Sequence, residues 1–282
     1  MTAAVLRYAA FTDGGVGGNP AGVVLDARGL SDTEQLSLAA DVGYSETAFL
    51  TPTDQVDRFA LRYFSPLAEV AFCGHATIAT AVALAERGGV RPLRFDTAAG
   101  EIPVSTAASA DGIVATLTSA RTTSRPAGPD ELHAALAALR WSVNDLDFAY
   151  PPHVANAGVN HLVLAVRDRL RLRSLDYDYD ALATLMSARD WTTLHLVYPE
   201  TPTLFHVRDP FPPGGVVEDP ATGAAAAAFG GYLRDLGLIQ PPATITVLQG
   251  YDMGRPSRLV VDVPADDTRV RVTGTATEMT ER

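Results

Sequence analysis

The chain has 282 residues, of which 47% are hydrophobic, and this is enough to bury one large core or two smaller ones. Its formal net charge of −11 argues against a nucleic-acid partner, because a nucleic-acid groove requires clustered positive charge. The sequence has no run of about 18 apolar residues and does not begin like a secretory signal, so we expect no membrane partner and a cytoplasmic location.

The first half of the chain predicts a strand-rich unit. An apolar strand over residues 21–25 follows Gly18-Asn19-Pro20, and Ser31 ahead of Glu34 predicts the start of a helix. A turn containing Cys73-Gly74-His75 then opens a helix rich in alanine. Such a helix is hydrophobic on all sides and is expected to be buried. The remaining strands are expected at residues 47–51, 58–64, 93–97 and 101–105.

The second half repeats this order of elements. Its strand-like segments are residues 160–166, 193–198, 203–208, 245–248 and 258–263, with a helix expected at residues 180–187. The turn Glu218-Asp-Pro-Ala-Thr-Gly223 opens a second alanine-rich helix. We therefore predict an α+β protein of two pseudo-symmetric lobes, each a mostly antiparallel sheet wrapped around a central helix.

The lobe boundaries follow from composition. Residues 118–130 are polar and lack apolar periodicity, which predicts a linker. We assign residues 1–118 to the N-terminal lobe and 119–265 to the C-terminal lobe. The C-terminal segment, residues 266–282, is expected to return to the first lobe.

The two helix starts predict anion sites. The first N–H groups of a helix have no partner within it, and the helix dipole gives this end a partial positive charge. Two such ends, one in each half, predict a pocket between two related lobes.

Three side chains are candidates for chemistry. Glu46 precedes a predicted strand, and the corresponding segment of the second half, which includes His195, has no carboxylate. His75 lies in the first turn of its helix, where the helix field favours a neutral ring. Asp219 has the matching place in the second half. The structural alternatives are an exposed glutamate at a strand end and two residues that cap their own turns.

Several other chemistries are excluded or disfavoured. Cys73 is the only cysteine, which excludes racemisation by two thiols. A Cys73–His75 nucleophile would require neighbours on one turn to meet, so we expect Cys73 to be a small buried hydrophobe. The chain has no lysine, which excludes lysine-bound pyridoxal phosphate. The six histidines form no metal-binding pattern, and we expect no metal.

These motifs together resemble the PhzF-like family of phenazine biosynthesis. The marks are Gly18-Asn19-Pro20, Ser45-Glu46-Thr47, Phe72-Cys-Gly-His-Ala-Thr77, Glu218-Asp-Pro-Ala-Thr-Gly223 and Gln249-Gly250 with Gly254-Arg255-Pro256. The resemblance implies a diaminopimelate-epimerase-like fold with curved sheets, an enzyme without a cofactor, and a homodimer.

The resemblance also assigns the site. It implies that Glu46, His75 and Asp219 are the catalytic residues. Gly74 and Gly223 would hold the substrate carboxylate through backbone N–H groups. Asn19, Cys73 and Ala224 are expected to contact the substrate as well.

The founding member of that family isomerises trans-2,3-dihydro-3-hydroxyanthranilate by moving a proton between two carbons. This chain has Ala224 where the family pattern usually has serine, and its segment Arg208-Asp-Pro-Phe211 also departs from the pattern. We therefore predict a proton shift in a related cyclic unsaturated amino acid of specialised, antibiotic-type metabolism. The alternatives are a hydrolase that uses Cys73 or a water activated by Glu46, and an inactive homologue that only binds a small molecule.

Overall fold

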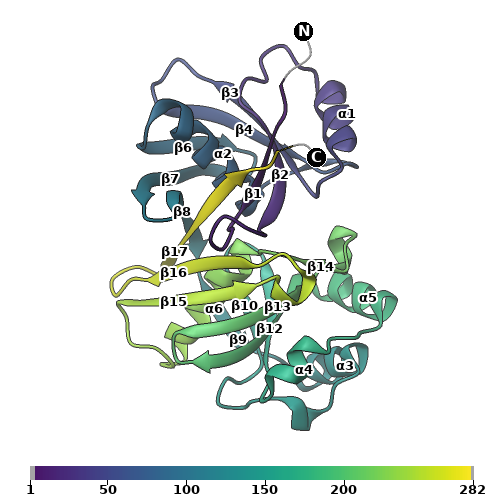
Figure 1. The fold of residues 1–282 in the computed structure, drawn as a ribbon. Coiled ribbons are helices and arrows are strands. Elements are labelled where there is room, and N and C mark those ends of the chain that lie inside the picture. Colours follow the sequence, from purple (N-terminus) through teal and green to yellow (C-terminus); the bar gives the residue numbers. More distant parts are fainter. Residues whose placement is uncertain (1–3, 281–282) are drawn as a thin grey trace. The chain divides into compact units, whose positions relative to one another are not determined.

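The computed structural model describes residues 4–280 and divides into two compact units (Figure 1). Unit 1 comprises the residues up to Thr118 together with those from Thr273 onward, and unit 2 comprises Ser119–Val272. The C-terminal segment of unit 1 thus begins at Thr273 and not at residue 266, because the first residues of the last strand belong to unit 2. Each unit is a mixed α+β structure made mainly of sheet.

Unit 1 combines a sheet with two helices. Its elements are β1 (Leu6–Ala10), β2 (Asn19–Val24), α1 (Asp32–Val42), β3 (Thr47–Pro52), β4 (Arg58–Phe64), β5 (Glu69–Val70), α2 (Gly74–Gly88), β6 (Pro92–Thr97), β7 (Gly100–Ser109), β8 (Gly112–Arg121) and the end of β17 (Arg269–Glu278).

The strands of unit 1 pair in the order β17–β1–β2–β3–β4–β6–β7–β8. The β2–β3 and β4–β6 pairs are parallel, because a helix lies between their strands in the chain, and the other pairs are antiparallel. Helix α2 packs against β1, β2, β3 and β7, and every residue from His75 to Ala83 is buried.

Unit 2 has its own sheet and a larger set of helices. Its elements are β9 (Thr123–Pro126), α3 (Pro129–Leu139), β10 (His153–Asn156), β11 (Asn160–Ala165), α4 (Arg169–Arg173), α5 (Tyr179–Arg189), β12 (Trp191–Thr201), β13 (Leu204–Pro210), β14 (Glu218–Asp219), α6 (Gly223–Asp235), β15 (Ala243–Gln249) and β16 (Ser257–Val263).

The pairing pattern of unit 2 matches that of unit 1. Strands β10 and β11 are antiparallel, β12 joins β11 in parallel, β13 turns back on β12, and β15 joins β13 in parallel before β16 turns back on β15. Helix α6 packs against β9, β10, β11 and β16, and every residue from Ala225 to Leu233 is buried. A separate apolar cluster, which includes Trp141, Leu182, Met186 and Trp191, fills the space between α3, α5 and the strands β11 and β12.

The predicted linker at residues 118–130 is wrong. This segment contains the end of β8, all of β9 and the first residues of α3. Strand β9 pairs with β10, and His153 lies opposite Pro126 although residues 127–152 lie between them in the chain. The polar composition reflects partly exposed strand positions, which composition alone does not distinguish from a linker. Among the described residues, none of the helices is both long and apolar enough to span a bilayer.

Gly18 directly precedes β2 and lies close to the backbone of Ala10, the last residue of β1. Its φ is +78°, and an added Cβ would lie 2.7 Å from the Ala10 carbonyl oxygen. Gly29 has a similar φ of +82°, but an added Cβ there would meet nothing within 4 Å. We expect Gly29→Ala to lower the free energy of unfolding by about 1 kcal/mol, from the backbone conformation alone.

Gly18→Ala should lower the free energy of unfolding by a further ~1–3 kcal/mol, because a backbone oxygen cannot move away as a side chain can. Urea denaturation followed by circular dichroism compares the two variants. Equal losses would show that the close approach to Ala10 carries no extra cost.

Candidate active site

The start of helix α2 is fixed by hydrogen bonds from its own first turn. Cys73 is the N-cap residue, with an extended backbone (φ −143°, ψ 114°), and its side chain makes no capping hydrogen bond. The Thr77 hydroxyl donates to the Cys73 carbonyl at 2.6 Å, and the Tyr63 hydroxyl lies 2.6 Å from the same Thr77 oxygen. Strand β4 thereby holds the helix start in place through Tyr63.

Two further segments meet this helix start. Glu46 directly precedes β3, and its carbonyl accepts a hydrogen bond from the Gly22 N–H of β2 at 3.2 Å. Asn19 is the first residue of β2 and is buried. The parallel pairing of β2 and β3 therefore places the beginnings of both strands at the same end of the sheet.

Four of the predicted site residues come together there. His75 Nε2 lies 3.4 Å from Glu46 Oε2, and Asn19 Nδ2 lies 3.2 Å from His75 Nδ1. Cys73 Sγ is 3.6 Å from Glu46 Oε2 and 3.4 Å from His75 Nδ1. The prediction that Cys73 and His75 would not meet is therefore wrong, although Cys73 is buried as expected. Because the extended N-cap residue does not follow helical geometry, its side chain can turn toward residue i+2.

Burial determines the charge of His75. Removal from water lowers the pKa of the His75 ring, while the nearby Glu46 charge and a hydrogen bond to the Pro20 carbonyl act in the opposite direction. The net effect is a lowered pKa, so the imidazole is neutral at neutral pH. The Glu46 side chain is 17% exposed against 8% for His75, so the carboxylate is the accessible member of the pair.

The space in front of Gly74 is open. An added Cβ would have the Phe72 ring, at 3.9 Å, as its nearest neighbour, and the backbone does not have a positive φ. Packing within unit 1 therefore does not require glycine here. A glycine that leaves the first N–H groups of a helix accessible is suited to a ligand that approaches the backbone closely.

Asp219, Gly223 and Ala224 belong to unit 2, where they surround the start of helix α6. The Asp219 carboxylate accepts a hydrogen bond from the Thr222 hydroxyl at 2.7 Å. Thr222 is the N-cap residue, and its side chain makes no capping bond. Gly223 is buried, whereas Ala224 is partly exposed. Their predicted roles toward a substrate stay predictions.

Gln249, for which the sequence predicts no role, holds this second helix start together. Its side chain donates to the Asp219 carbonyl at 2.7 Å and accepts from the Thr222 N–H at 3.0 Å. Gly250 follows with a φ of +76°, and an added Cβ would lie 2.3 Å from the Arg255 carbonyl oxygen. The Gln249-Gly250 motif was the available signal, but its partners are about thirty residues away in the chain.

A buried ion pair fixes strand β14. Arg208 on β13 bonds the Glu218 carboxylate through two nitrogens, and the pair's side chains are 13% and 4% exposed. Burial raises the pKa of the Glu218 carboxyl, and Arg208 opposes this shift. Since Glu218 directly precedes Asp219, this pair determines where Asp219 lies.

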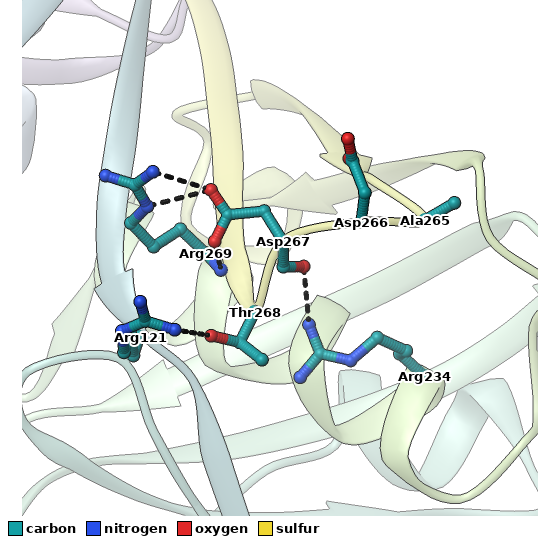
Figure 2. A pocket seen from close by; sticks show the side chains of 7 residues that line it. All are labelled: Arg121, Arg234, Ala265, Asp266, Asp267, Thr268 and Arg269. Atoms are coloured by element: carbon teal, nitrogen blue, oxygen red, sulfur yellow. Dashed lines mark hydrogen bonds and ion pairs between the residues drawn. The ribbon is translucent and has the colours of Figure 1, made fainter.

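A hollow of about 570 Å³ lies in unit 2, at the connection between β16 and β17 (Figure 2). Arg269 bonds the Asp267 carboxylate, Arg121 donates to the Thr268 hydroxyl, and Arg234 donates to the Asp267 carbonyl. Because protein groups already engage all three arginines, the hollow has no feature that distinguishes it as a ligand site.

The sequence pattern of the family described as phenazine biosynthesis-like protein matches residues 8–282. The chain belongs to this family. An uncharacterized isomerase from Deinococcus radiodurans is 33% identical over 280 residues, covering 95% of this chain and 90% of that protein. Trans-2,3-dihydro-3-hydroxyanthranilate isomerase from Pseudomonas chlororaphis is 29% identical over 95% of this chain and 93% of its own length.

Solved structures agree with the family assignment. The crystal structure of a Bacillus anthracis phenazine biosynthesis protein of the PhzF family has a TM-score of 0.86 and 27% identity, covering 98% of this chain and 96% of that one. The predicted family resemblance is therefore confirmed, and this member of the phenazine biosynthesis-like family is an isomerase.

The Arg208–Glu218 pair can be tested against an exposed pair. We expect Arg208→Met to lower the free energy of unfolding by about 3–5 kcal/mol, because it leaves a buried carboxylate unpaired. Arg140→Met, which removes an ion pair with exposed Asp176, should cost about 0–1 kcal/mol. Urea denaturation at neutral pH measures both values.

The loss of unfolding free energy in Arg208→Met should depend on pH in a defined direction. Without Arg208, burial and the charges of Asp209 and Asp252 all act on Glu218 in the same direction and hold its folded-state pKa above the unfolded value. The folded state then binds the proton more tightly, so the variant is least impaired below the ordinary glutamate pKa of about 4.5 and loses stability as pH rises above it. A deficit that does not change between acidic and neutral pH would contradict this account.

Proposed function

We propose that this protein is an isomerase that moves a proton, and with it a double bond, in a small carboxylate-bearing substrate, and that Glu46 carries the proton. The observation that supports this most directly is the 3.4 Å contact of the partly exposed Glu46 carboxylate with the buried His75 ring at the start of α2. A carboxylate that is accessible yet held by neighbours is suited to general acid–base catalysis.

The proposed reaction needs one acid–base group. The Glu46 carboxylate removes a proton from a substrate carbon, and the C–H bond electrons move into the conjugated system of the substrate. The resulting Glu46 carboxylic acid then returns the proton to a second carbon on the same face, and the double bond has moved. Substrate and product have the same composition, so the step consumes no oxidant, reductant or water.

The neighbours of Glu46 have supporting roles in this proposal. A neutral His75 hydrogen-bonds to the substrate or to Glu46 and adds no positive charge to the site. Asn19 orients the His75 ring through its contact at Nδ1. The open start of α2 at Gly74 binds the substrate carboxylate through backbone N–H groups.

The proposed substrate is a cyclic, unsaturated amino acid of specialised, antibiotic-type metabolism. The Pseudomonas chlororaphis relative is named for its action on trans-2,3-dihydro-3-hydroxyanthranilate. Ala224, which stands in place of the usual family serine, removes a hydroxyl group and favours a related substrate over that compound itself. Homodimer formation and a cytoplasmic location belong to the same proposal.

The strand order also supports a proposal about architecture. Units 1 and 2 show the same succession of parallel and antiparallel pairs, and each has a helix of small, buried residues, α2 and α6. We propose that the two units are pseudo-symmetric lobes of an epimerase-like fold, each built around its helix.

Glu46→Gln tests the proton carrier. We expect the variant to lose solvent-deuterium incorporation into the substrate by a factor of at least about 100, because glutamine cannot accept the proton. Binding of the substrate should remain, since the amide keeps the shape of the side chain. The measurement is deuterium uptake by mass spectrometry, with candidate cyclic diene and imine acids, in D₂O.

Glu101→Gln, which alters an exposed carboxylate on β7, is the matched control and should exchange like the unaltered protein. Full exchange by Glu46→Gln would remove Glu46 from the mechanism. An inactive homologue would instead bind the candidates without any exchange, in the unaltered protein as well.

A second candidate function, hydrolysis, is favoured by one observation. Cys73 Sγ lies 3.4 Å from His75 Nδ1, which is within reach of a thiol–imidazole pair. A thiol nucleophile would become acylated and release a product to which water has been added, whereas the proton shift yields an isomer of unchanged mass.

Cys73→Ala separates the two functions. We expect the variant to retain proton exchange within about tenfold of the unaltered protein, because Glu46 and not the thiol carries the proton. If Cys73 is a hydrolytic nucleophile, the substitution should abolish turnover altogether. Mass spectrometry of the products distinguishes an isomer from a hydrolysed compound.

A further inference from the structure

The side chains of Glu46, Cys73 and His75 form a compact set of three different metal-ligand types. One donor atom from each lies within 4.8 Å of the others. The histidines and the cysteine form no ligand pattern along the chain, and the sequence therefore predicts no metal site. The fold brings these ligands together from the beginning of β3 and the start of α2. A set assembled in this way cannot be seen as a spacing pattern in the sequence.

The spacing of the donor atoms is that of one face of a tetrahedron. Bonds of about 2.3 Å to sulfur and about 2.0–2.1 Å to nitrogen and oxygen separate the ligand atoms of a tetrahedral Zn²⁺ site by about 3.3–3.6 Å. The corresponding separations are 3.6 Å from Cys73 Sγ to Glu46 Oε2, 3.4 Å from Glu46 Oε2 to His75 Nε2, and 3.7 Å from Cys73 Sγ to His75 Nε2. These side chains need to move little to bind an ion.

The surroundings of His75 prepare it as a ligand. The ring donates a hydrogen bond to the Pro20 carbonyl, and a neutral imidazole has only one N–H. The other ring nitrogen then has a lone pair that is available to a metal. Outer hydrogen bonds of this kind orient metal-binding histidines.

The charge balance is also suitable. A thiolate and a carboxylate together neutralise a divalent cation, and the partial positive charge at the start of α2 stabilises the thiolate. A sulfur ligand disfavours Mg²⁺ and Ca²⁺, which prefer oxygen, and favours Zn²⁺ and ions of similar softness. Three protein ligands leave a fourth position open.

We propose that Glu46, Cys73 and His75 form a binding site for Zn²⁺ or a similar thiophilic divalent cation. A bound ion occupies the Glu46 carboxylate and excludes it from proton transfer, so the metal is a reversible inhibitor of the isomerase. The inhibition rests on the proposed role of Glu46, whereas metal binding itself does not.

Co²⁺ provides a direct probe of this site. The protein is first stripped of metal with a chelator and then titrated with CoCl₂ while its absorption spectrum is recorded. A Co²⁺–thiolate bond produces charge-transfer absorption in the near ultraviolet, and because Cys73 is the only cysteine of the chain, this band reports on Cys73 alone. We expect the band to saturate at one equivalent and to disappear when Zn²⁺ displaces Co²⁺.

Three variants test the ligand set. Cys73→Ser should abolish the band, while His75→Asn and Glu46→Gln should keep a thiolate but weaken binding by roughly 100-fold, since loss of even an outer-shell partner costs about 10–100-fold. His206→Asn, which alters the contact with Glu200 in unit 2, is the matched control and should bind like the unaltered protein. Circular dichroism establishes that each variant is folded.

The possible outcomes separate binding from function. Absence of the band in the unaltered protein, or a band whose affinity is unchanged in His75→Asn and Glu46→Gln, would overturn the site. In the deuterium-exchange assay, Zn²⁺ should inhibit and a chelator should restore activity. Undiminished exchange by the zinc-saturated protein would overturn the inhibition. If no substrate undergoes exchange at all, the proposed function fails and the cobalt spectrum still decides the site.

Discussion

The burial of helix α2 against strands on several sides is the constraint on which the rest of unit 1 depends. A helix in this position has no exposed face, so its residues must be small, and the buried stretch from His75 to Ala83 consists mainly of alanine and threonine. The same burial prevents water from reaching most of the helix. Its first N–H groups, which have no partner within the helix, therefore interact with whatever lies at the helix start. Cys73 supplies no side-chain cap, which leaves that end available for a ligand.

Burial and the helix field act on His75 in the same direction. Both disfavour a protonated His75, and the field favours negative charge, such as the carboxylate of Glu46 or of a bound acid. The neutral imidazole therefore lies beside the Glu46 side chain without forming an ion pair with it. This arrangement agrees with the proposed proton transfer, because the neutral ring beside Glu46 stays able to hydrogen-bond.

Periodicity predicted the strands with good accuracy where neighbouring residues decide the structure. Strand β4 spans Arg58–Phe64, the range expected from its alternating side chains, and β3 and β16 differ from expectation by one residue each. The segment before α3 was misjudged because β9 exists only through pairing with β10, which its own composition does not reveal.

The site shows the same limit. Glu46 and His75 were identified by position and by family resemblance, but their distance from Cys73 depends on the extended N-cap backbone and on the register of β2 with β3. Gln249 was overlooked because its hydrogen-bond partners lie far away in the chain. Sequence reasoning found residue types that could do chemistry, whereas their contacts required the fold.

The two helix starts differ in how the nearby carboxylate, Asp219 at α6 and Glu46 at α2, is hydrogen-bonded. At α6, the Asp219 carboxylate accepts the Thr222 hydroxyl at 2.7 Å, and Gln249 holds both residues through further hydrogen bonds. These hydrogen bonds hold the Asp219 carboxylate in one position. Glu46 has longer contacts, 3.4 Å to His75 Nε2 and 3.6 Å to Cys73 Sγ, so the protein holds this carboxylate less tightly. The same succession of strands and helix thus supports one carboxylate that is fixed in place and another that is held less tightly, and this difference is why our proposal assigns proton transfer to Glu46 and an orienting role to Asp219.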